Sequence, residues 1–79
     1  MEKPVLDLDQ LEYNGSMIYD AYKQGAKVNI KYFKDDNFHE ITCYIDKPMN
    51  IWDMVVRCSN DEDREIDIPF NWIVQVIKV

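Results

Sequence analysis

The clearest pattern in the sequence is the alternation of apolar and polar residues that follows Gly25. Successive side chains of a β-strand point to opposite faces, so a period of two predicts strands with one buried face. Polar turns that read KDDN, DKPMN and SNDED separate the first four alternating stretches. The pattern therefore predicts five short strands, at residues 26–33, 39–45, 51–58, 64–70 and 73–79.

A helical pattern precedes the strands. Four apolar side chains recur at helical spacing, namely Met17, Ile18, Ala21 and Tyr22. Ser16 can cap the first turn through its hydroxyl, and Gly25 suits the left-handed residue that ends many helices. We expect a helix of roughly three turns between them. Residues 1–14 are interpreted as an N-terminal arm, and residues 15–79 as a single domain.

The stretch PFNW connects the last two predicted strands. Pro69 has no N–H to donate to a sheet, so it marks the end of a strand, and the next residues fit a single helical turn. A helix, five short strands and a one-turn link before the last strand predict a mainly β fold. The order is that of a small SH3-like or Sm-like five-stranded barrel preceded by an N-terminal helix. An OB-fold has its helix between the third and fourth strands instead.

Inward and outward positions follow from the alternation. Trp52 and Phe70 fall on inward positions and are expected in the core, and Cys43 and Cys58 are expected there as free thiols. The remaining aromatic residues at turns or outward positions either pack beside the core or form an exposed contact patch. Together with two residues of the last strand, they are the candidate partner-binding residues: Phe33, Phe38, Tyr44, Trp72, Val74 and Val76.

The net charge of the chain limits the classes of molecule that it is expected to bind. Asp and Glu outnumber Lys and Arg 15 to 9, a formal net charge of -6 over 79 residues. Such a field repels phosphate backbones, which argues against direct nucleic-acid binding and against an Sm-like RNA-binding role, and favours basic protein surfaces. The start of the chain lacks the features of a signal peptide and no apolar run is long enough to span a membrane. We therefore expect a cytoplasmic protein.

Residues that could carry out chemistry are sparse. His39 is the only histidine and stands beside turn carboxylates, and the acidic stretch 59–63 lacks the spacing of a calcium loop. The only glycines, Gly15 and Gly25, do not form a phosphate-binding loop. Neither serine nor cysteine has a base nearby in the expected fold. We expect no catalytic residue, no cofactor and no bound metal.

Several stretches resemble the YolD-like family, small proteins of Firmicutes and of their phages and plasmids. The similarity rests on AYKQG at the end of the helix, VNIKYF, ITCYID closing at Asp46, MVVRC, and IDIPFNWIVQV. The chain differs at the turn after the first strand, where most family members have glycine and this chain has Asp36 and Asn37. The resemblance implies a non-enzymatic accessory protein with an Sm-like barrel. Such proteins are often encoded beside Y-family DNA polymerases.

Two functional hypotheses remain open. The first is a protein-binding module that serves DNA repair or replication, with a Y-family polymerase or another DNA-processing protein as its partner. The alternative is a phage inhibitor whose acidic surface mimics DNA, which clustered carboxylates would favour. The strongly β-forming last stretch, 73–79, is expected to be an unpaired sheet edge. Such an edge would recruit a partner strand or a second copy of the chain.

Overall fold

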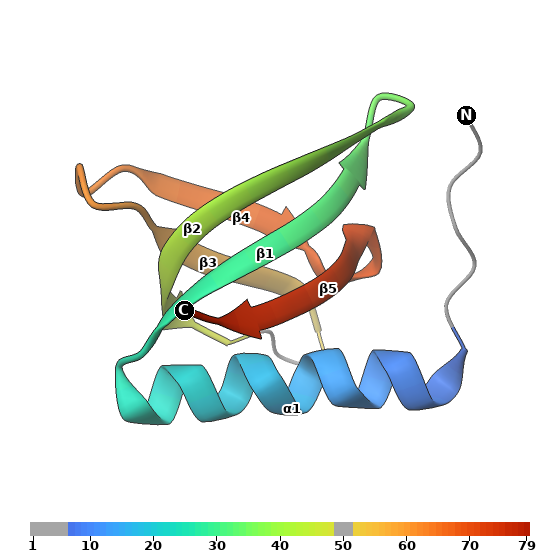
Figure 1. The fold of residues 1–79 in the computed structure, drawn as a ribbon, viewed down its shortest axis with the longest axis horizontal. Coiled ribbons are helices and arrows are strands. Elements are labelled where there is room, and N and C mark those ends of the chain that lie inside the picture. The colour runs from blue at the N-terminus through green and yellow to red at the C-terminus, as the bar shows by residue number, and fades with distance from the viewer. Residues whose placement is uncertain (1–6, 49–51) are drawn as a thin grey trace.

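The computed structural model describes residues 7–48 and 52–79 and shows one helix followed by an antiparallel sheet (Figure 1). The sheet has five strands in the order β4-β3-β2-β1-β5. This confirms the predicted mainly β barrel with a leading helix. The elements are α1 (Leu8–Gln24), β1 (Lys27–Lys34), β2 (Asn37–Lys47), β3 (Val55–Ser59), β4 (Glu65–Pro69), the 3-10 turn η1 (Phe70–Trp72) and β5 (Ile73–Lys78).

The helix is longer than predicted. Its N-cap is Asp7, whose carboxylate accepts a hydrogen bond from the backbone N–H of Gln10 at 2.8 Å, so the expected start at Ser16 is wrong. Residues 8–14, which were assigned to an N-terminal arm, form the first half of α1. Leu11 packs against the core, and such packing offsets the low helix propensity of Gly15. Gly25 ends the helix with φ +63°, as predicted.

The helix covers one end of the curled sheet. Figure 1 shows α1 running along that end, while the β1–β2 turn projects at the opposite end. Every element contributes to the core between them, and Phe70 is buried as predicted, with 7% of its surface exposed. The fully buried apolar residues are Ile18, Ala21, Val28, Ile30, Cys43, Val56, Cys58, Ile68, Ile73 and Val76.

The predicted burial of Trp52 is wrong. Its side chain is 88% exposed and lies in the turn before β3, which begins only at Val55. Val56 and Cys58 point inward as predicted, but Met54 has a left-handed φ of 51°. That residue breaks the period of two, so the inward parity does not extend back to position 52. The predicted start of this strand at position 51, and positions 49 and 50 of the preceding turn, lie outside the described residues.

Candidate protein-binding site

Among the described residues, the last strand forms one edge of the sheet, because it neighbours only β1 in the strand order. The backbone N–H of Val79 donates to the carbonyl of Lys27 at 3.0 Å. Bonded and non-bonded pairs alternate along an antiparallel ladder, so Ile77 also bonds to β1. The N–H groups of Val76 and Lys78 therefore point away from β1. Val76 is 1% exposed, so its N–H is covered, whereas Lys78 is an exposed residue whose N–H lies at the open part of the edge. This edge is the one predicted at residues 73–79.

The side chains of β5 do not follow the predicted alternation. The pairing with β1 shifts register between Lys31 and Tyr32, which is a β-bulge. Because of the bulge, Ile73 and Val76 both point inward, and Val76 is 1% exposed. The assignment of the Val76 side chain to a partner-binding surface is therefore wrong. Val74 is half-buried, and Ile77 is 48% exposed instead.

A buried asparagine connects the helix to this edge strand. Asn14 is completely buried, its Nδ2 donates to the carbonyl of Val74 at 3.2 Å, and its Oδ1 accepts from Nε2 of Gln10 at 3.0 Å. Both ends of the amide are thus satisfied, as a buried polar side chain requires. The sequence pattern did not single out Asn14, because residues 1–14 were expected to lie outside the domain. Its polarity within an otherwise apolar helix face was the available signal.

Three of the predicted aromatic residues meet at the end of the sheet farthest from α1. Phe33 and Phe38 are paired across β1 and β2, with ring centroids 5.1 Å apart in an edge-on arrangement. Trp72 is the last residue of η1 and lines the same pocket as Phe33. We call Phe33, Phe38 and Trp72 the hairpin aromatic cluster. Phe33 is buried, Trp72 is half-buried and Phe38 is exposed. Tyr44 lies near the other end of β2, opposite Ser59 of β3, and does not join them.

Lysine side chains cover the exposed faces of these rings. Lys31 Nζ lies 4.8 Å from the ring centroid of Phe38, and Lys34 Nζ lies 5.6 Å from that of Trp72. Ammonium groups are attracted to the negative face of an aromatic ring, most strongly to that of tryptophan. The hairpin aromatic cluster therefore already accepts cations from its own chain.

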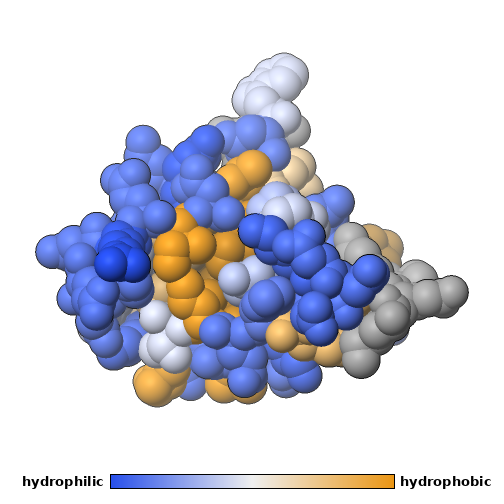
Figure 2. All heavy atoms as spheres, turned by 90° about the horizontal axis from the view of Figure 1, so that it is seen from above, coloured by the Kyte–Doolittle hydropathy of each residue, from blue (hydrophilic) through white to orange (hydrophobic). Residues whose placement is uncertain are grey.

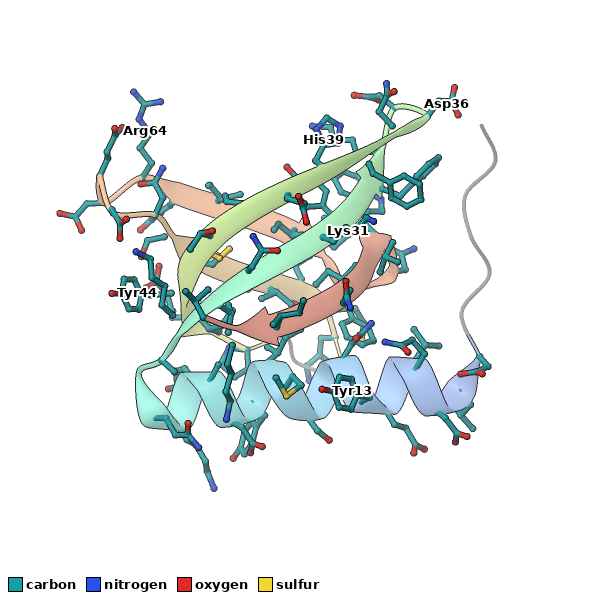
Figure 3. The ribbon with its side chains drawn as sticks, viewed as in Figure 1. Tyr13, Lys31, Asp36, His39, Tyr44 and Arg64 are labelled. Carbon is teal, nitrogen blue, oxygen red and sulfur yellow. The ribbon has the colours of Figure 1, made fainter. Side chains whose placement is uncertain are left out.

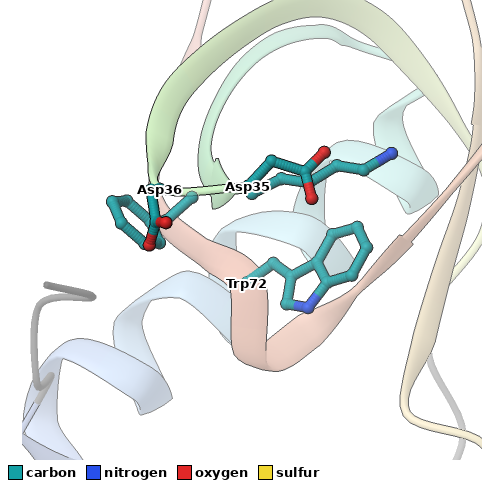
Figure 4. Close-up of a pocket in the computed structure, with 5 residues that line it drawn as sticks. Asp35, Asp36 and Trp72 are labelled. Carbon is teal, nitrogen blue, oxygen red and sulfur yellow. The ribbon is translucent and has the colours of Figure 1, made fainter. Parts of the chain in front are cut away.

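Beside this cluster lies a pocket of about 320 Å³, lined by Phe33, Lys34, Asp35, Asp36 and Trp72 (Figure 4). Asp35 and Asp36 form the two-residue turn between β1 and β2 and have left-handed φ angles of 53° and 62°. Two left-handed residues in succession match the twist of a tight hairpin. Throughout the described residues, the ion pairs involve other carboxylates, those of Asp53, Asp61 and Glu62. The pocket thus combines an aromatic wall with two carboxylates that form no ion pair there.

The cysteines offer no exposed nucleophile. Cys43 and Cys58 are free and buried, as predicted, and the Cys58 thiol donates to the carbonyl of Ile66 at 3.3 Å. A hydrogen bond with Cys43 and burial both raise the pKa of Cys58, while the same bond lowers the pKa of Cys43. Among residues 7–48 and 52–79, no three His, Cys, Asp or Glu side chains converge as a metal site requires. The helix in that part of the chain is too short and polar to cross a membrane.

The fold is a small SH3-like barrel whose last strand lies at one edge of the sheet, is bonded to α1 at Val74 and ends in exposed residues. The family model for YolD-like proteins matches residues 1–77, and the chain belongs to that family. No curated protein and no solved structure matches the chain.

Proposed function

We propose that this protein is a non-enzymatic, cytoplasmic binding module that captures an extended segment of a partner protein along β5. The observation that supports this function best is the position of β5 at the edge of the sheet, with the N–H of the exposed residue Lys78 directed away from β1. An extended peptide can add to such an edge through main-chain hydrogen bonds. A second copy of the chain could bind in the same way and form a homo-oligomer.

The cellular role that we propose is accessory to DNA repair or replication, in a bacterium, a phage or another mobile element. Membership of the YolD-like family supports this role, and a Y-family DNA polymerase is the partner that we propose. Trp72, the half-buried member of the hairpin aromatic cluster, directly precedes β5, and the exposed Phe38 lies on β2, on the other side of β1. Aromatic side chains of this kind are enriched in protein interfaces.

The distribution of charge disfavours the alternative of a DNA mimic. Carboxylates occur on α1, in the β1–β2 turn, in the β3–β4 loop and on β4, which are spread over the molecule (Figure 3). Basic side chains lie among them: Lys27 pairs with Asp61 at 2.9 Å, and Arg57 pairs with Asp53 at 2.9 Å. A surface that imitates a phosphate backbone would instead present carboxylates together on one face.

A proline at the free edge tests strand capture. Lys78→Pro removes an N–H that points away from β1, so the sheet keeps its own bonds, and a proline at an edge is tolerated. We expect Lys78→Pro to weaken binding to a Y-family DNA polymerase of the same host at least ~10-fold. This change corresponds to the loss of one or two main-chain hydrogen bonds between the partner and β5. Titration calorimetry measures the affinity, and circular dichroism checks that the variant stays folded.

Lys78→Ala is the matched control, because it removes the same side chain and its bond to Gln24 but keeps the N–H. We expect it to bind as the wild type does. Equal affinity of the proline and alanine variants for the polymerase would contradict capture along β5. Displacement of the protein from the polymerase by duplex DNA, weakening with added salt, would favour the DNA mimic instead.

A further inference from the structure

The pocket beside Trp72 has the features of a site for a positively charged side chain. One wall is the indole of Trp72, with the buried Phe33 beside it, and the opposite rim carries the carboxylates of the β1–β2 turn. Figure 4 shows Asp35 and Trp72 facing one another across the pocket. An aromatic face and a carboxylate on opposite sides both attract a cation placed between them.

Three further observations point to a cation rather than an anion. The ammonium of Lys34 already lies over the Trp72 ring, which shows that this wall accepts a positive charge. Within the described residues, Asp35 and Asp36 take part in no ion pair, so their charges are available to a ligand. The net charge of -6 adds a long-range attraction for basic partners.

We infer that this pocket binds an arginine side chain of the protein partner. A guanidinium is planar, so it can stack on the indole while its N–H groups bond to a carboxylate, which a lysine ammonium cannot do as well. Trp72 immediately precedes Ile73, the first residue of β5. A segment that runs along β5 as far as this first residue can place an arginine in the pocket, and the arginine then fixes the position of the segment along β5. The inference rests on the strand capture proposed above and adds the chemistry of the captured segment.

Nuclear magnetic resonance of the Trp72 indole N–H tests the pocket directly. The probe is the capped pentapeptide acetyl-Gly-Ser-Arg-Ser-Gly-amide, and Trp52→Phe serves as the background protein so that Trp72 is the only tryptophan. We expect a saturable shift of the Trp72 signal with a dissociation constant on the order of 1 mM, as suits one side chain. The same peptide with citrulline, the neutral analogue of arginine, is expected to bind at least ~10-fold more weakly.

Two variants are expected to change the affinity for the arginine peptide in opposite directions, and a third is the control. Asp35→Asn and Asp36→Asn keep a residue that tolerates left-handed φ, and together they are expected to weaken binding ~5-fold or more. Lys34→Met removes the competing cation and keeps the aliphatic chain, so it is expected to tighten binding ~2-fold or more. Asp63→Asn is the control: it makes the same type of substitution, with the loss of one negative charge, at another left-handed residue, in the β3–β4 loop. Figure 3 shows that loop, at Arg64, far from Asp36.

The outcomes separate this inference from the proposed function. Three results would each contradict arginine binding in the pocket: an unshifted Trp72 signal, equal binding of the citrulline and arginine peptides, or weaker binding of the arginine peptide by Lys34→Met. If Lys78→Pro still blocks binding of the polymerase in that case, strand capture stands and only the pocket fails. If the pocket binds arginine as expected but Lys78→Pro has no effect on the polymerase, strand capture fails. The pocket is then a site for a cation that does not belong to a segment captured along β5.

Discussion

Val76→Asp is expected to unfold the protein at 25 °C. The side chain is 1% exposed on the inner face of β5, so the substitution places a carboxylate without a partner inside the core. Burying an unpaired charge costs on the order of 4 kcal/mol or more, and the whole free energy of unfolding of a domain this size is about 4–12 kcal/mol. Far-ultraviolet circular dichroism during thermal and urea unfolding measures the change.

Ile77→Asp is the matched comparison, because it makes a similar change at the next residue, whose side chain is 48% exposed. We expect this variant to fold, with a loss of about 1 kcal/mol from apolar burial and strand propensity. The difference in stability between Val76→Asp and Ile77→Asp shows which side chain of β5 points into the core and which points to solvent. Equal stability of the two variants, or unfolding of Ile77→Asp alone, would show that the bulge in the β1–β5 pairing is wrongly placed.

Asn14→Ala is expected to lower the free energy of unfolding by about 2 kcal/mol. It removes the bonds of the amide to the Val74 carbonyl and to Gln10, and it leaves the Val74 carbonyl without its helix partner. An unsatisfied buried polar group costs about 1–3 kcal/mol, against a gain of less than ~1 kcal/mol from the better helix propensity of alanine. Urea unfolding followed by circular dichroism measures the difference.

Two substitutions control this result. Glu12→Ala changes an exposed residue of the same helix, and we expect an effect within ~0.5 kcal/mol. Asn14→Asp keeps the shape of the side chain but loses the donor when ionised, so it is expected to destabilise more than alanine does at pH 7. If Asn14→Ala were as stable as the wild type, α1 would not be anchored to β5 through this amide.

The sequence predicted the strands well where the backbone is regular. In the first half of β1 and the second half of β2 the period of two held, and Val28, Ile30, Cys43 and Ile45 are all buried. At the end of β1 it did not hold, because Phe33 is buried and the preceding residue is only half-buried. The pattern failed where one residue breaks the regular backbone. The left-handed Met54 displaced Trp52 to the surface, and the bulge opposite β1 brought Val76 into the core. Neither irregularity leaves a signal in the hydrophobic pattern.

The candidate site was predictable in part. The KDDN turn and its left-handed residues follow from the tolerance of Asp for such dihedrals, and a two-residue turn then places Phe33 opposite Phe38. Trp72 joins them only because the β4–β5 connection crosses to the start of β5 beside β1. The pocket depends on that long-range arrangement. Local patterns carry no information about it.

Amide hydrogen exchange at Lys78 tests strand capture along β5 most directly. In the free protein its N–H faces the open edge, so it should exchange much faster than the N–H of Ile77, which bonds to β1. With a saturating Y-family DNA polymerase, capture of a segment along β5 is expected to slow exchange at Lys78 by roughly 100-fold and to leave Ile77 little changed. An unchanged exchange rate at Lys78 in the saturated complex would contradict binding through the β5 edge.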